Sequence, residues 1–302
     1  MCVICPRACG AERNVIVGYC GCTNDCRVAR IGLHHFEEPC ISGTCGSGTI
    51  FFSGCNLRCV YCQNMPLQSG RVGQILSARE LCDTMLRLQD IGAHNINLVT
   101  PTPHLLTVCE AIARAKAQGL TIPILYNTSA YETTAAIEQL CGLVDIYLPD
   151  LKYKSTELSA RFSACMDYFE KAWAAILAMF AQVGHLQLDE DGIATRGVLI
   201  RHLVLPGCAF DTRDVLSEIA ATFSPDCHLS LMRQYTPLPD IQPPLNRSIT
   251  DREYESCVDH CLSLGFSHVY VQDKKSASFA YTPEFYDKLP DDYDKLHDFT
   301  LA

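Results

Sequence analysis

Three cysteines share one short stretch of the sequence. In "GTIFFSGCNLRCVYCQN", residues 48–64, Cys55, Cys59 and Cys62 are spaced C-x3-C-x2-C after an apolar run that predicts a buried strand. Thiolates are the ligands of iron–sulfur clusters, and a [4Fe–4S] cube held by only three of them keeps one iron open for a substrate or cofactor. A structural zinc ion with a fourth ligand elsewhere is the alternative. The glycine-led position after a strand favours the open cluster, since α/β barrels assemble their active sites there.

A second group of cysteines lies near the N-terminus of the sequence. Cys2, Cys5, Cys9 and Cys20 follow the pattern C-x2-C-x3-C-x10-C, which can hold a tetrahedral zinc ion or a second iron–sulfur cluster. The spacing does not separate zinc from a cluster, and a patch of free thiols is a third interpretation. Cys22 and Cys26 add a C-x-C-x3-C run, which leaves open the four ligands that this site uses, and Cys40 and Cys45 could reach either site or pack locally. We expect the rest to be packing thiols, including Cys257 and Cys261 on one predicted helix face.

The composition limits the class of protein. The chain has 302 residues, 19 cysteines and a formal net charge of −10 at pH 7. The acidic balance argues against a nucleic-acid binder with a basic surface. We find no apolar run long enough to span a membrane and no signal peptide, so we expect a cytoplasmic protein. In a reducing cytoplasm, so many cysteines favour metal or cluster ligation over disulfides.

Strands and helices alternate along most of the sequence. We predict strands at 49–52, 95–99, 122–126, 144–148, 198–205, 229–233 and 268–271, with helical periodicity between most of them. Ser77 with Glu80 and Thr250 with Glu253 have the spacing of capping boxes, and 168–183 has a strongly apolar helix face. This βαβ order predicts an α/β fold with a parallel sheet, a full or partial barrel. We expect a cysteine-rich appendage at 1–46, the barrel at 47–272, and a C-terminal tail at 273–302 that wraps the barrel or frays.

The cysteine motif resembles the signature of radical S-adenosylmethionine (SAM) enzymes, with Tyr61 as the aromatic residue before the last cysteine. The stretches "EEPCISGTCGSGTIFFSGCNLRCVYCQN", "INLVTPT", "YNTSAYE", "VDIYLPDLKY" and "RHLVLPG" are similar to the branch related to pyruvate formate-lyase activating enzyme. Within that branch the chain resembles uncharacterised relatives with an N-terminal C-x2-C-P-R-x-C. The resemblance runs from Cys2 to about Gln272.

The resemblance implies a fold, a chemistry and partners. The fold would be a partial (β/α)6 TIM-like barrel. Cys55, Cys59 and Cys62 would bind a [4Fe–4S] cluster whose fourth iron chelates SAM, and Tyr61 would lie near the adenine. An electron from a reductant such as flavodoxin or ferredoxin would cleave SAM to a 5′-deoxyadenosyl radical, which abstracts a hydrogen atom. The substrate would be a glycyl-radical-type protein or another peptide. The alternatives are a small molecule, or a non-catalytic iron–sulfur or zinc protein for electron transfer or assembly.

Candidate contacts for SAM follow from the same comparison. Many members of the family carry Gly-Gly-Glu after the second strand, where this chain has Thr100-Pro101-Thr102, which offers carbonyls and hydroxyls but no carboxylate. Polar residues after later strands could contact ribose or carboxylate, or serve as turn and cap residues: Asn127, Thr128, Asp150 and Lys152. Arg201 and His202 could contact SAM or substrate, or form a buried, satisfied pair. Glu37 and Glu38 precede the strand that leads to the cysteine motif, and we expect their carboxylates to be solvated rather than catalytic.

Overall fold

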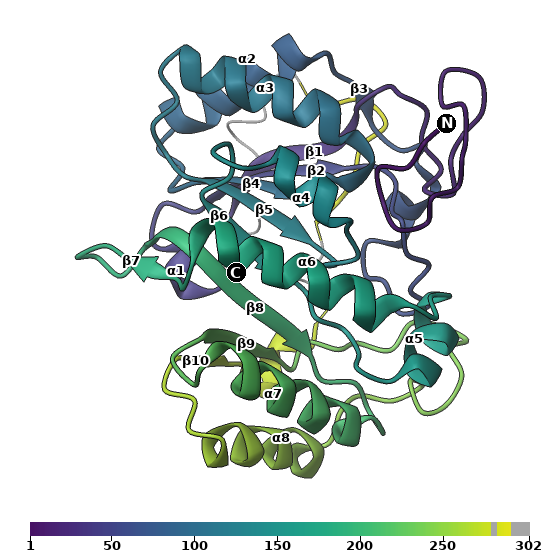
Figure 1. Cartoon of the computed structure of the whole chain (residues 1–302), viewed down its shortest axis with the longest axis vertical. Coiled ribbons are helices and arrows are strands. Elements are labelled where there is room, and N and C mark those ends of the chain that lie inside the picture. Colours follow the sequence, from purple (N-terminus) through teal and green to yellow (C-terminus); the bar gives the residue numbers. More distant parts are fainter. Residues whose placement is uncertain (279–282, 291–302) are drawn as a thin grey trace.

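The computed structural model describes residues 1–278 and 283–290, and its centre is one large sheet. Each of the seven predicted strands is present, with bounds within a few residues of the prediction. In the sheet these strands lie in the order β10-β9-β8-β6-β5-β4-β2, and each runs parallel to its neighbours (Figure 1). Their bounds are β2 (Ser47–Phe52), β4 (Ile96–Val99), β5 (Ile124–Thr128), β6 (Ile146–Pro149), β8 (Ala194–Leu203), β9 (His228–Met232) and β10 (Val269–Val271). The sheet does not close on itself, which confirms the predicted partial barrel.

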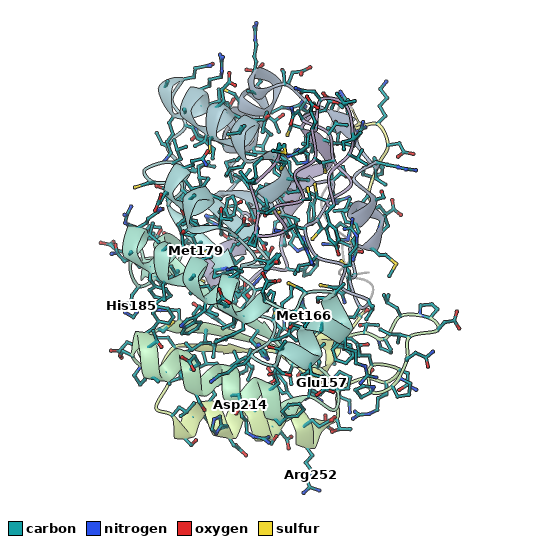
Figure 2. All side chains as sticks on the ribbon, turned by 45° about the vertical axis from the view of Figure 1, so that its right-hand side comes forward. Glu157, Met166, Met179, His185, Asp214 and Arg252 are labelled. Atoms are coloured by element: carbon teal, nitrogen blue, oxygen red, sulfur yellow. The ribbon has the colours of Figure 1, made fainter. Side chains whose placement is uncertain are left out.

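Helices flank the sheet and cover its outer face (Figure 1). They are α2 (Ala78–Asp90), α3 (Leu105–Ala117), α4 (Thr134–Gln139), α5 (Thr156–Ser163), α6 (Tyr168–Val183), α7 (Ala209–Phe223) and α8 (Asp251–Ser263). Both predicted capping boxes are present, at the start of α2 and of α8. Figure 2 shows α6 between Met166, just before its start, and His185, just after its end, and Met179 within the helix is buried. Within the described ranges, no helix is both long and apolar enough to cross a membrane.

The sheet also contains a strand that the sequence did not predict. β1 (Arg27–His34) pairs antiparallel with β2 and with the short β3 (Gln74–Ile75), although it lies inside the stretch expected to be an appendage without a core. Seven of its eight residues are buried, so no alternation of polar and apolar residues marked it as a strand. The main sheet therefore begins about 20 residues before position 47, because β1 buries its side chains against the barrel and not against metal.

Residues 283–290 of the predicted tail pack beside β1. The backbone N–H of Tyr286 donates to the carbonyl of Ala29 at 2.9 Å, and the rings of Phe285 and Phe51 meet edge to face at 5.6 Å. This part of the tail wraps the barrel, as one of the two expectations had it. The rest of the predicted tail, 279–282 and 291–302, lies outside the described residues.

A single turn of helix closes the amino-terminal end of the parallel strands. α1 (Pro39–Ser42) carries Ile41, which is fully buried in a cluster with Leu125 and Ile146, near the start of β5 and β6, and with Ala194, the first residue of β8. The side chain of Asn95, just before β4, donates to the Ile41 carbonyl at 2.8 Å. The interior of the barrel is therefore blocked at this end and accessible from the opposite one.

Candidate active site

A cavity of about 570 Å³ occupies the inside of the partial barrel. Its walls come from the loop after β2, from the ends of β4 to β6, and from the inner faces of β8 to β10. Nine of the sequence-predicted site residues line it: Cys55, Cys59, Cys62, Tyr61, Thr100, Asn127, Thr128, Asp150 and Lys152. The topology brings these residues together because the carboxyl ends of parallel strands meet at one edge of a sheet.

The three cysteines of the motif face this cavity from one loop, with Cys59 buried and the other two partly buried. Burial raises the pKa of Cys55 to about 12, and negative charge on Cys59 and Cys62 acts in the same direction. Such thiols bind iron as thiolates only when the cation offsets their mutual repulsion. Three soft donors on one wall of a cavity, with space in front of them, fit a cluster that keeps one open iron.

Glycine is required just before the first of these cysteines. Gly54 has φ +92°, and a Cβ there would overlap the Cys22 sulfur and lie 3.0 Å from the Cys20 carbonyl oxygen. We expect Gly54→Ala to lower the free energy of unfolding by more than the 1–3 kcal/mol or so that backbone strain alone costs. Gly142→Ala is the matched control, since Gly142 has φ +75° and nothing within 4 Å of an added Cβ. Equal losses in denaturant unfolding of the two variants would refute the steric argument.

A network of charged side chains crosses the cavity at mid-height. The guanidinium of Arg201 donates to Glu37 Oε2, to Asp150 Oδ1 and to Asn127 Oδ1, each at 2.8 Å. Lys152 Nζ donates to the other Asp150 oxygen at 2.9 Å. Burial opposes ionisation of Asp150 and Lys152, yet Arg201 and Lys152 hold the pKa of Asp150 below its usual range, and Asp150 raises the pKa of Lys152. Glu37 was expected to be solvated, and the structure makes it a buried partner of Arg201 instead.

Glu38, next to this network, also lines the cavity. Burial raises the pKa of its carboxyl, and the neighbouring Glu37 adds to that shift while Arg201 opposes it. Among the residues that the structure describes, Glu38 Oε2 is one of the buried side-chain atoms without a hydrogen-bond partner. A buried acceptor of this kind is expensive to leave unpaired, so its position in a cavity points to a ligand group or water.

A row of hydroxyls connects the cysteine loop to Tyr61. Ser163 Oγ lies 2.9 Å from Cys59 Sγ and 2.8 Å from the Tyr153 hydroxyl, which in turn lies 2.6 Å from the Tyr61 hydroxyl. Tyr61 also packs edge to face against Tyr235 at 6.2 Å. No local pattern predicted this row, because Tyr153 and Ser163 are 92 and 104 positions from Tyr61 and Cys59 in the sequence.

The Thr-Pro-Thr stretch after β4 divides between two environments. Thr100 lines the cavity with φ +59°, an uncommon conformation for a β-branched residue and one that clusters at functional sites. Thr102 points elsewhere and donates to Glu132 at 2.5 Å, as does Thr128 at 2.6 Å. Burial raises the pKa of Glu132 to about 7. Glu132, from "YNTSAYE", is a buried acceptor for these two threonines and does not line the cavity, so it does not replace the carboxylate that the stretch lacks.

His202 is the one proposed SAM contact that the structure does not bring to the cavity. Its Nδ1 lies 2.6 Å from the Leu151 carbonyl and its Nε2 lies 2.9 Å from Thr212 Oγ1 on α7. Successive residues of a strand face opposite sides, so Arg201 points inward and His202 outward. His202 is therefore a buried, satisfied histidine, one of the two alternatives given above.

The N-terminal cysteines lie beside the cluster loop, at the strand ends to which the arrowheads point (Figure 1). A Cβ on Gly18 would contact Cys20 Sγ at 3.4 Å and Cys9 Sγ at 3.5 Å, so both sulfur atoms lie beside one glycine. Burial raises the pKa of Cys5 to about 11, and negative charge on Cys20 and Cys2 contributes to that shift. These four are therefore neighbours in space.

Only part of the additional set stands apart from that group. Cys26 belongs to the main apolar core. Cys22 lies beside Cys20, with its Sγ 3.7 Å from the Cys20 carbonyl and 3.3 Å from the Ser53 carbonyl. Cys257 and Cys261 are buried, as expected for packing thiols. Within 1–278 and 283–290, no three Cys, His, Asp or Glu side chains stand close enough to hold a single metal ion. The metal site at Cys2, Cys5, Cys9 and Cys20 stays a prediction.

Comparison with known proteins agrees with the cysteine loop and the open barrel. Residues 49–180 match the family model described as the radical SAM superfamily. Residues 49–180, which include the three cysteines of the motif, therefore form a radical SAM domain, and radical SAM enzymes use a [4Fe–4S] cluster and SAM. A relative in sequence is an uncharacterized protein of Methanocaldococcus jannaschii, MJ0674, which is 26% identical over 269 residues, 85% of this chain and 73% of the relative.

Two solved structures share the fold. HydG, a maturase of the [FeFe]-hydrogenase, matches with a TM-score of 0.53 and 14% identity over 80% of this chain and 55% of its own. TsrM from Kitasatospora setae, a radical SAM methyltransferase, matches with a TM-score of 0.51 and 13% identity over 81% of this chain and 57% of its own. The chain thus spans little more than half the length of either solved protein. The partial α/β barrel and the enzyme class predicted from the sequence are confirmed.

Proposed function

We propose that Cys55, Cys59 and Cys62 bind the [4Fe–4S] cluster of this radical SAM enzyme and leave one iron for SAM. The observation that carries the proposal is that all three thiols line one cavity together with the polar ends of β4, β5 and β6. When bound, the cluster supplies one electron to SAM, giving methionine and a 5′-deoxyadenosyl radical for hydrogen abstraction. The protein holds the reactants in place and keeps water out, because the cavity is closed at its far end by α1.

The polar residues of the cavity supply contacts for SAM. Lys152 offers an ammonium to the carboxylate of SAM, and Asp150 offers a carboxylate oxygen to its hydroxyls or its amine. Asn127 and Thr128 end β5 at the same level. Thr100 presents its backbone at the turn after β4, and Tyr61 presents its ring beside Tyr235. The stretch Thr100-Pro101-Thr102 has no carboxylate to offer to SAM.

As substrate we propose a protein or peptide, with a glycyl-radical-type partner as the first choice. The support is the resemblance of the quoted stretches to the branch of pyruvate formate-lyase activating enzyme. The reductant would be a flavodoxin or ferredoxin in the cytoplasm, a reducing compartment suited to 19 cysteines. A small molecule is the second candidate, because Glu38 leaves an unpaired acceptor deep in a cavity with a closed end.

Deuterium transfer separates the two kinds of substrate. The reconstituted enzyme is incubated anaerobically with SAM, dithionite and extract from cells grown in D2O, divided by size into macromolecules and small molecules. Because the radical takes hydrogen from its substrate, deuterated 5′-deoxyadenosine is expected from the macromolecular fraction. Deuterium only from the small-molecule fraction would replace the first choice by the second. No 5′-deoxyadenosine from any sample would contradict the proposed reaction itself.

Ser163 is expected to tune the cluster through Cys59. With Cys59 as a thiolate ligand, the Ser163 hydroxyl 2.9 Å away donates to its sulfur and stabilises the more negative, reduced cluster. A hydrogen bond of about 1 kcal/mol corresponds to roughly 40 mV for a one-electron couple, so Ser163→Ala should lower the midpoint potential by about that amount. Redox titration followed by electron paramagnetic resonance (EPR) measures it. Ser159→Ala, on the same helix, is the control because its hydroxyl bonds the Thr156 carbonyl; equal potentials in both variants would refute the role.

A further inference from the structure

The N-terminal segment and the cluster loop form one hydrogen-bonded unit. We call Cys2, Cys5, Cys9 and Cys20 the appendage cysteines. The backbone N–H of Cys55 donates to the carbonyl oxygen of Cys20 at 3.3 Å. The first cysteine of the radical SAM motif and the last of the appendage cysteines are therefore direct neighbours, although 35 positions separate them in the sequence.

Stacked side chains fix this contact on both sides. Arg7, which follows Cys5 in the C-x2-C-P-R-x-C run, lies 4.3 Å from the ring centre of Tyr19 and donates through Nε to the Asn56 carbonyl at 2.8 Å. Arg58, from the cluster loop, lies 4.7 Å from the same ring and donates to the Tyr19 carbonyl. One aromatic ring that contacts two guanidinium groups therefore joins the appendage to the loop, and these partly buried side chains favour cation–π contacts more than fully exposed ones would.

One of the appendage cysteines reaches the surface. Cys9 is exposed, Cys2 and Cys5 are partly exposed and Cys20 is buried, whereas Cys55, Cys59 and Cys62 face the cavity that SAM and substrate would fill. A protein reductant can approach the appendage cysteines at the surface, but it cannot reach the inside of the barrel. Electrons must therefore pass through the protein to reach Cys55, Cys59 and Cys62. The hydrogen bond between Cys20 and Cys55 provides a short route.

We propose that the appendage cysteines bind a second iron–sulfur cluster, which passes single electrons through the Cys20–Cys55 hydrogen bond to the cluster of the motif. This inference rests on the proposed function for its acceptor. A one-electron protein reductant is oxidised, the second cluster is reduced and then reoxidised, and the inner cluster receives the electron that each SAM cleavage consumes. No proton or group is transferred between the clusters.

The appendage cysteines lie close to one another. The sulfur atoms of Cys9 and Cys20 lie beside Gly18, where an added Cβ would meet them at 3.5 Å and 3.4 Å. Negative charge on Cys20 and Cys2 acts on Cys5, so these thiols are near it as well. Four thiolates gathered at one place are a ligand set for an iron–sulfur cluster.

Metal analysis of a variant without the inner site tests the second cluster alone. The full-length Cys55→Ala/Cys59→Ala/Cys62→Ala protein is reconstituted anaerobically with iron and sulfide. About four iron and four sulfide per chain are expected, with a reducible EPR signal, against about twice that content in the wild type. Zinc in place of iron, or no metal, would overturn the proposal. This readout needs no SAM cleavage, so it stands even if the proposed reaction is wrong.

The electron route is tested by the choice of reductant. The rate of 5′-deoxyadenosine formation is measured with reduced flavodoxin and with dithionite, a small reductant that can enter the cavity. In Cys5→Ala/Cys9→Ala protein the ratio of the flavodoxin rate to the dithionite rate should fall at least about tenfold, equivalent to 1.4 kcal/mol in the barrier. Cys141→Ala, which alters an exposed thiol outside both groups, should keep the wild-type ratio. An unchanged ratio in the double variant would refute the relay.

Discussion

Cys59→Ala protein is expected to form at least about 100-fold less 5′-deoxyadenosine than the wild type when both are reconstituted and supplied with SAM and dithionite. Cys59 is the middle ligand of the proposed set, and its sulfur is buried on the wall of the cavity. Two remaining thiolates cannot keep three irons ligated, so the cluster is lost or loses the geometry that leaves one iron for SAM. The product is quantified by chromatography, and iron is counted on the same samples.

The control for this variant is a buried cysteine away from the cavity. Cys257→Ala removes a fully buried thiol from α8, so it tests whether any buried cysteine is essential. Its yield of 5′-deoxyadenosine per iron should equal that of the wild type. Equal yields from Cys59→Ala and the wild type would remove Cys59 from the ligand set.

Arg201→Met is expected to give the largest loss of stability. Arg201 neutralises Glu37 and Asp150 inside the barrel, and all three side chains are at least four-fifths buried. Removing one partner of a buried ion pair typically costs about 3–5 kcal/mol, because the remaining charge has no compensation. Denaturant unfolding measures the loss. Arg196→Met is the control, since Arg196 is an exposed residue of the same strand that bonds the Gln182 carbonyl.

The pH dependence of this loss has a definite sign. In the wild type the pKa of Asp150 is lowered, so its contribution to stability is present above the ordinary aspartate pKa and is lost as pH falls through the lowered value. Burial already raises the pKa of Glu38, and without Arg201 the charge that opposes this shift is gone, so protonation of Glu38 stabilises the folded variant. The difference between wild type and variant should therefore shrink as pH falls from about 8 to about 5. A difference that grows over this range would contradict the assignment.

Local signals were sufficient to predict most of the elements. The seven parallel strands are short apolar runs between helical patterns, and the boxes at Ser77 and Thr250 mark helix starts by hydrogen bonds within three residues. β1 was missed because both of its faces are buried, one by the barrel and one by residues 283–290, which come from the other end of the sequence. A buried strand of that kind has no periodicity to detect.

The site was predictable to the extent that strand ends define it. Thr100, Asn127, Asp150 and Lys152 follow predicted strands, so topology alone brings them to one cavity. Glu37, one of the three partners of Arg201, was not predictable. It lies just before α1, far from the strand ends in the sequence, and reaches the interior of the barrel only through the turn into that helix. The sequence alone also did not predict which of Arg201 and His202 points into the barrel. Two successive side chains of a strand face opposite sides, but which side is the interior depends on how β8 packs with its neighbours.

The most direct test of the central claim is the EPR spectrum of the reduced protein with and without SAM. If Cys55, Cys59 and Cys62 hold a cluster with one open iron, adding SAM changes the ligation of that iron, and the signal of the reduced cluster shifts. The Cys55→Ala/Cys59→Ala/Cys62→Ala protein should show no such shift. A wild-type protein that contains the cluster, yet gives the same spectrum with and without excess SAM, would contradict the account.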